Sequence, residues 1–157
     1  MTRVEEQLTI GCTAEAFLGF VMDVERYAEV DDKLRTVYWV RRDGDLTEFA
    51  FRPALPGVPF PQPKAVAQMR LTPGERIDIR LAPLPLNKIN HHMAGFAARF
   101  TCDPVDGGVR VTRMIEFRFR PGPGRLLAPL LRRTLPGSVA RELRLAKEIL
   151  ERGDTST

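Results

Sequence analysis

The residue best suited to bind a charged group is Arg113, which lies in the segment VRVTRMIEFRF. Arg113 has the same parity as Val111 and Ile115, so a regular strand would direct all three side chains to one apolar face. A guanidinium stays charged at any biological pH, and once buried it needs a carboxylate, a phosphate or a ligand oxyanion beside it. Arg113 is therefore a candidate for binding a ligand carboxylate or enolate. The alternatives are a structural ion pair and a bulge that turns the side chain outward.

Glu6 and His92 are the other candidates for proton transfer or ion pairing. Glu6 is in phase with Leu8 and Ile10, which predicts a carboxylate on an otherwise apolar strand face. His92 has the same parity as Phe96 on an expected strand, and its imidazole titrates near neutral pH, so it is a candidate acid–base group. The alternatives are a structural carboxylate, and a histidine that is hydrogen-bonded in the core or at a rim.

The motifs of several common functional classes are missing from the sequence. It contains no GxSxG, no GxGxxG after a strand, no P-loop and no paired acidic framework, which disfavours nucleotide binding and ordinary hydrolysis. The histidines and cysteines do not have metal-ligand spacing, so we expect no metal and no cofactor. No helix-turn-helix, zinc-finger or RNP-like pattern indicates nucleic-acid binding.

The length of the chain, 157 residues, is that of one domain, which we place at residues 1–153 with a frayed tail at 154–157. A composition of 43% hydrophobic and 28% charged residues is typical of a soluble globular protein. No apolar stretch is long enough to span a membrane, and the first ten residues do not resemble a signal peptide. Cys12 and Cys102 are far apart in sequence, so we expect reduced thiols in a cytoplasmic protein; a secreted protein with one disulfide is the alternative.

The positive charge of the chain is concentrated near its C-terminus. Residues 1–120 carry 17 Lys and Arg against 16 Asp and Glu, whereas residues 121–157 carry 7 against 4. Such a segment could attract an acidic partner, an anionic membrane surface or nucleic acid. The alternative is a solvated, arginine-rich helix face.

The pattern of apolar residues predicts about seven strands, two short helices and one long helix. In chain order these are a strand at 3–10, short helices after Thr13 and Asp23, hairpins at 35–52, 64–82 and 93–120, and a helix at 134–153. A proline-rich loop at 52–63 and a second loop at 83–90 separate the hairpins. A single antiparallel sheet must then cover its apolar face with few helices, and only the last helix is long. We therefore expect an α+β fold in which a curved sheet wraps around the C-terminal helix.

This order of elements resembles the START-like superfamily, also called SRPBCC, of polyketide cyclases, dehydrases and lipid-transfer proteins. The resemblance rests on the segments VEEQLTIGCTAEAF, FVMDVERYAEV, GGVRVTRMIEFRF and LLAPLLRRTLPGSVARELRLAKEILE, and it extends over nearly the whole chain. It implies the helix-grip fold, with loops 52–63 and 83–90 near the mouth of a cavity. It also implies that the first and last strands are neighbours, so Glu6 could pair with Arg113, and a buried pair of this kind is structural by default. The superfamily has no universal active-site motif, so the resemblance predicts the fold better than the function.

In such a fold the core and the cavity wall are one surface, so inner-face residues are also the candidate ligand contacts. Tyr38 and Trp39 cannot both face inward from a regular strand. We expect ligand contacts from Trp39, Phe49, Phe51, Met69, His92, Phe96, Phe100, Arg113, Ile115 and Phe117.

Three functions fit these expectations. The first is binding or transport of a hydrophobic small molecule, neutral or anionic, such as a lipid or polyketide. The second is a polyketide cyclase or aromatase, whose basic C-terminal segment could dock an acidic carrier protein. The third is a protein-interaction module with a filled cavity. The protein would act as a monomer or homodimer, and the many Arg and Pro residues point to a GC-rich bacterial genome.

Overall fold

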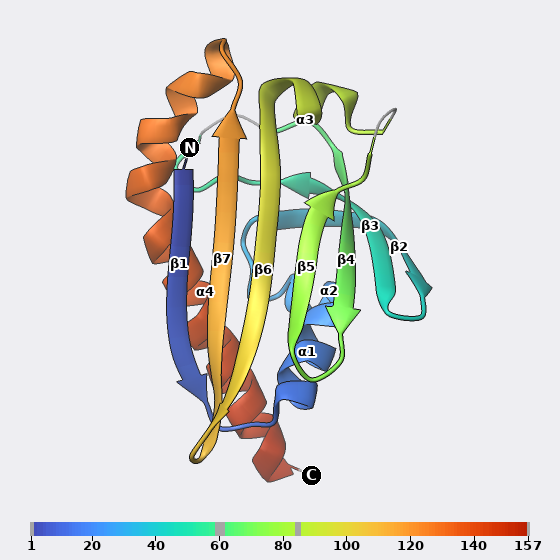
Figure 1. Ribbon diagram of the computed structural model, residues 1–157, viewed down its shortest axis with the longest axis vertical. Helices are drawn as coiled ribbons and strands as arrows, with labels where there is room; N and C mark the ends of the chain where they lie inside the picture. The colour runs from blue at the N-terminus through green and yellow to red at the C-terminus, as the bar shows by residue number, and fades with distance from the viewer. Residues whose placement is uncertain (1, 59–61, 84–85, 157) are drawn as a thin grey trace.

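The computed structural model describes residues 2–58, 62–83 and 86–156, without the side chains of 92, 93, 123, 124 and 153–156 (Figure 1). One antiparallel sheet contains seven strands in the order β1-β7-β6-β5-β4-β3-β2. The strands are β1 (Thr2–Ile10), β2 (Leu34–Asp43), β3 (Leu46–Pro53), β4 (Ala65–Thr72), β5 (Arg76–Leu81), β6 (Ala94–Val105) and β7 (Gly108–Phe119). The helices are α1 (Ala14–Met22), α2 (Val24–Tyr27), α3 (Lys88–Met93), the 3₁₀ helix η1 (Pro123–Leu127) and α4 (Ala128–Ser156).

The helices pack on one face of the curved sheet, as the predicted α+β fold requires. In Figure 1, α4 runs along β1 and β7, while α1 and α2 lie behind the strands in the middle of the sheet. The helix-grip architecture and the position of β1 beside β7 are confirmed. The apolar residues at alternate positions of the strands and along α4 form the core between these layers.

The two short helices after β1 are also confirmed. Thr13 caps α1, because its side chain accepts a hydrogen bond from the backbone N–H of Ala16 at 3.1 Å. Asp23 separates α1 from α2. Tyr27, at the end of α2, is buried and contacts the ring of Phe100 edge-on, so α2 is anchored to the centre of the sheet.

Helix α4 is longer than predicted. It begins at Ala128 rather than at Thr134, and it ends at Ser156 rather than at Gly153. We expected the helix to begin at Thr134, with Pro136 in its first turn, because proline lacks the N–H that an interior helical position donates. In the structure, Leu131 and Leu135 are fully buried against the sheet, and this packing maintains two helical turns ahead of the proline.

The segment before β6 is helical rather than extended. We expected His92 on a strand, but it lies with His91 in α3, and β6 begins only at Ala94. Asn87 stands before α3 with a positive φ, and its side chain bonds both the N–H and the carbonyl of Val66 on β4. These bonds fix a compact turn where periodicity alone indicated a loop followed by a strand.

Candidate functional site

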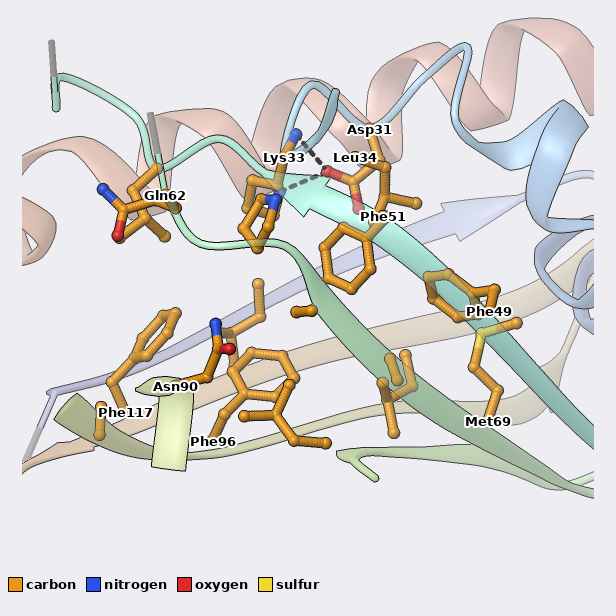
Figure 2. A pocket seen from close by; sticks show the side chains of 18 of the residues that line it. Asp31, Lys33, Leu34, Phe49, Phe51, Gln62, Met69, Asn90, Phe96 and Phe117 are labelled. Atoms are coloured by element: carbon orange, nitrogen blue, oxygen red, sulfur yellow. Dashed lines mark hydrogen bonds and ion pairs between the residues drawn. The ribbon is translucent and has the colours of Figure 1, made fainter. Parts of the chain in front are cut away.

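An internal cavity of about 150 Å³ lies on the concave face of the sheet, toward the end of the molecule that bears α3 (Figure 2). Its walls are mainly aromatic and aliphatic side chains from β3 to β7. Eight of the ten residues expected to contact a ligand line this cavity: Phe49, Phe51, Met69, Phe96, Phe100, Arg113, Ile115 and Phe117. Their alternation along regular strands accounts for the agreement.

The expected inward position of Trp39 is wrong. Its side chain is 37% exposed, and Arg41 lies over the ring at 5.4 Å. The pairing of β2 with β3 is irregular at two places, between Leu34 and Thr36 and between Val37 and Trp39. Each irregularity shifts the alternation of side chains, and as a result both Tyr38 and Trp39 face solvent.

His92 cannot be assigned to the cavity, because its side chain lies outside the described part of the structure. The neighbouring His91 is described, and a nitrogen of its ring lies 2.8 Å from the carbonyl oxygen of Ala82. Arg120 in turn donates to the backbone carbonyl of His91 at 2.8 Å. His91 therefore links α3 to Ala82 and Arg120, the residues that directly follow β5 and β7, which is a structural role.

Both loops that the resemblance placed near the cavity contribute to its lining. Leu55 and Gln62 come from the proline-rich loop, and Asn90 comes from α3, which occupies part of the second segment (Figure 2). Asn90 also donates to the carbonyl of Pro63 at 3.4 Å, which joins the two segments. Leu127 of η1 completes this end of the cavity.

The opposite end of the cavity contains a buried network of four charges. Lys33 Nζ lies 2.8 Å from Asp31 Oδ1 and 2.9 Å from Glu142 Oε1. Arg113 Nη2 lies 3.6 Å from Asp31 Oδ2, and Arg113 Nε lies 3.2 Å from Glu142 Oε2. All four side chains are almost fully buried, and the two cations balance the two carboxylates. The ion pair of Asp31 and Lys33 is visible in Figure 2.

Tyr27 extends this network, because its hydroxyl donates a hydrogen bond to Glu142. Burial, followed by the negative charge of Glu142, raises the pKa of Tyr27 well above its usual value, so the phenol stays protonated. Burial by itself lowers the pKa of Lys33, but the carboxylates of Glu142 and Asp31 outweigh burial and leave that pKa raised. Lys33 is therefore a charged ammonium at neutral pH.

Arg113 pairs with Asp31 and Glu142 rather than with Glu6. Glu6 does lie directly opposite Arg113 in the register of β1 and β7, as the neighbouring strands predicted. The guanidinium instead extends over the ring of Phe100, 4.1 Å from its centre, and reaches the carboxylates of the α2–β2 connection and α4. Arg113 therefore takes part in a buried ion pair, with different partners from the Glu6 that the resemblance suggested.

Arg113 keeps two side-chain nitrogens without a hydrogen bond within this network. Its Nη1 is buried and has no hydrogen-bond partner among the described residues. Nε is close to Glu142 but too poorly aligned for a hydrogen bond. Because Arg113 lines the cavity, the unused Nη1 donor stands where a bound molecule could supply an acceptor.

Sequence reasoning missed Asp31, Lys33 and Glu142. Glu142 had a detectable signal, since it lies within the apolar stripe of α4 between Val139 and Ala146. A carboxylate on such a stripe needs a buried partner. Asp31 and Lys33 lie in a short connection that has no periodicity, so nothing in the sequence indicated their burial.

Within residues 2–58, 62–83 and 86–156, no group of three His, Cys, Asp or Glu side chains is arranged to hold a metal ion. None of the helices in this described part is both long and apolar enough to cross a membrane. Cys12 and Cys102 are both buried and are not joined in a disulfide.

The chain belongs to the family described as "Polyketide cyclase / dehydrase and lipid transport", which it matches over residues 1–151. No curated protein matches the sequence. Solved structures of the same fold include TTHA0849 from Thermus thermophilus, with a TM-score of 0.76 and 14% identity over 96% of this chain and 98% of that one. The Zhui aromatase/cyclase from Streptomyces sp. R1128 gives a TM-score of 0.76 and 13% identity over 96% and 93%. A STAR-related lipid transfer protein from Xanthomonas axonopodis gives 0.67 and 14% over 94% and 84%.

Proposed function

We propose that this protein reversibly binds a small hydrophobic molecule in the cavity, with a hydrogen-bond acceptor of that molecule next to Arg113. The observation that carries the proposal is an apolar cavity that ends at a buried guanidinium with an unused donor. An interaction module with a filled core fits less well, because about 150 Å³ is empty. We also infer a cytoplasmic location, because the chain has only two cysteines and they are not joined in a disulfide.

The balance of the buried charges determines the chemical class of the ligand. Asp31 and Glu142 already neutralise Lys33 and Arg113, so an anionic ligand would bury one uncompensated negative charge. A neutral acceptor such as a ketone oxygen satisfies the donor of Arg113 without that cost. We therefore propose a neutral carbonyl compound, rather than the carboxylate or enolate considered from the sequence, as the partner of Arg113.

The volume of the cavity determines the size of the ligand. An apolar cavity of about 150 Å³ accommodates roughly one aromatic ring. Acetophenone, ethylbenzene and benzoate share this size and differ only in having a neutral acceptor, no acceptor and a negative charge. We expect acetophenone to bind more tightly than ethylbenzene, and benzoate to bind most weakly, in isothermal titration calorimetry.

Two variants test this assignment. Ala67 is buried and lines the cavity, so Ala67→Phe should fill it and abolish binding of all three probes. Ala97 is exposed on the outer face of β6, and Ala97→Phe serves as the matched control that retains binding. The charge-neutral double variant Arg113→Met/Glu142→Gln should equalise acetophenone and ethylbenzene. Unchanged binding by Ala67→Phe would refute the cavity as the site.

A polyketide cyclase or aromatase is the second candidate. It is favoured by the pair of Tyr27 and Glu142 at the end of the cavity that contains the buried charges. Tyr27 lines the cavity and its hydroxyl donates a hydrogen bond to a carboxylate, an arrangement that can move a proton to a substrate oxygen. The raised pKa of Tyr27 makes it a weak acid that would protonate only a strongly basic oxygen, such as an enolate. Conversion of a poly-β-ketone, lost in Tyr27→Phe, would favour the enzyme over the carrier.

A further inference from the structure

The positive charge of the molecule is concentrated at one end. We define the α3 end as residues 52–58, 62–64, 83, 86–93 and 118–133, the segments around α3, η1 and the start of α4 at the top of Figure 1. In sequence these segments contain eight Lys and Arg and no Asp or Glu. The rest of the chain contains 16 Lys and Arg against 20 Asp and Glu, a net charge of −4. The protein is thus polarised along its long axis.

The same end exposes large aliphatic side chains. Leu126 on η1 is 80% exposed, Ile89 on α3 is 63% exposed, and Leu86 just before α3 is 46% exposed. Helices α3 and η1 contact each other, so these residues belong to one continuous surface. The other large hydrophobic residues exposed in the described part of the chain, Tyr38 and Trp39, lie on β2. An exposed apolar surface of this kind marks an interaction site.

This surface adjoins the cavity. Asn90 and Leu127 line the cavity, while Ile89 and Leu126, their immediate neighbours in sequence, are exposed to solvent. The exposed cations Lys88 and Arg125 flank the two aliphatic residues along the chain. The arrangement therefore combines protruding aliphatic groups with positive charge next to the cavity.

We propose that the α3 end docks on an anionic lipid bilayer. Ile89 and Leu126 enter the apolar side of the headgroup layer, while Lys88 and Arg125 remain at the level of the lipid phosphates. The charge complements an anionic surface, because the α3 end has no acidic residue. A bilayer fits better than an acidic protein, since the exposed apolar residues here are aliphatic and protein interfaces favour aromatic anchors. Docking would bring the α3 end of the cavity to the membrane.

Flotation of the full-length protein with vesicles tests the proposal. We expect binding to vesicles of phosphatidylcholine mixed with an equal part of phosphatidylglycerol, little binding to phosphatidylcholine alone, and weaker binding as salt is added. The Ile89→Ser/Leu126→Ser variant should lower the partition coefficient about tenfold or more, because both side chains leave the bilayer. The Lys88→Gln/Arg125→Gln variant should lower it about 30-fold, from the loss of two cations near the lipid phosphates.

Matched control variants distinguish the effect of the α3 end from the effect of removing positive charge or an exposed hydrophobic side chain anywhere on the protein. Arg110→Gln/Arg144→Gln removes two exposed cations away from the α3 end, and Trp39→Ser removes an exposed hydrophobic residue from β2; both should keep wild-type binding. Equal binding to both kinds of vesicle, or equal losses in the control variants, would overturn the proposal. So would binding to an acidic carrier protein without binding to vesicles. Acetophenone titration of Ile89→Ser/Leu126→Ser reports separately on the cavity, so the two proposals can fail independently.

Discussion

At the scale of single residues, four buried charges both hold segments of the fold together and contribute to the wall of the cavity. They belong to Lys33, Arg113, Asp31 and Glu142. They join the α2–β2 connection, β7 and α4, and they leave two nitrogens of Arg113, a residue that lines the cavity, without a hydrogen bond among the described residues. Glu142 is the common partner, since it contacts Lys33, Arg113 and Tyr27. The network should therefore depend most strongly on this one carboxylate.

Replacing Glu142 by glutamine should destabilise the protein strongly. The change keeps the size of the side chain but leaves the two cations with one carboxylate, and breaking a buried ion pair in this way costs about 3–5 kcal/mol. Urea denaturation followed by circular dichroism measures the effect. Glu148→Gln, at an exposed position of the same helix, should change stability by less than about 0.5 kcal/mol. Similar values for the two variants would contradict the role given to Glu142.

The sequence predicted the walls of the cavity better than its polar end. Phe49, Phe100 and Ile115 follow a strict alternation on regular strands, which is sufficient to assign their face. Trp39 breaks this rule because the irregular pairing of β2 with β3 is not visible as periodicity. The ion partners of Arg113 come from segments distant in sequence, so its burial could be inferred while its partners could not.

At the scale of elements, the junction of β1 with the β6–β7 hairpin is tightly constrained. Gly108 is the first residue of β7, and a Cβ atom there would lie 2.0 Å from the backbone carbonyl oxygen of Ile10. A backbone atom within a strand cannot move aside easily. Only glycine therefore allows β1 to approach this end of β7 so closely.

Gly108→Ala should lower the free energy of unfolding by about 1–3 kcal/mol, because the new methyl group forces β1 and β7 apart. Gly19→Ala is the matched control on α1, where a Cβ meets nothing within 4 Å. It should raise stability by about 0.5–1 kcal/mol through the higher helix propensity of alanine. Thermal and urea unfolding of both variants measures these changes. A stable Gly108→Ala variant would show that β1 can shift without cost.

The elements that the sequence predicted correctly are those with local signals. Asp43-Gly44 and Thr72-Pro73-Gly74 mark the first two hairpins, and Gly44 and Gly74 do have positive φ values. Helix α3 and the first turns of α4 lack such signals, because they depend on tertiary contacts. The side chain of Asn87 fixes the start of α3, and buried leucines maintain α4 ahead of Pro136.

At the scale of the whole molecule, α4 and the sheet should unfold as one unit. The core clusters include residues from α1, α2, α4 and most strands, and Ile79 packs against both clusters. Trp39, the single tryptophan, reports on β2 at one edge of the sheet, whereas far-ultraviolet circular dichroism reports mainly on the helices. We expect the two signals to change at the same urea concentration, as they do for one cooperative domain. A tryptophan transition at lower urea would show that the β2 edge unfolds separately.

The irregular pairing of β2 has a consequence for behaviour at high protein concentration. β2 is an edge strand, and an unpaired strand edge can recruit a strand from another chain and so begin aggregation. The two irregularities interrupt the regular spacing of its free N–H and carbonyl groups, and exposed Arg35, Arg41 and Arg42 add repulsion between copies. The feature that places Trp39 outside the cavity therefore also protects this edge against self-association.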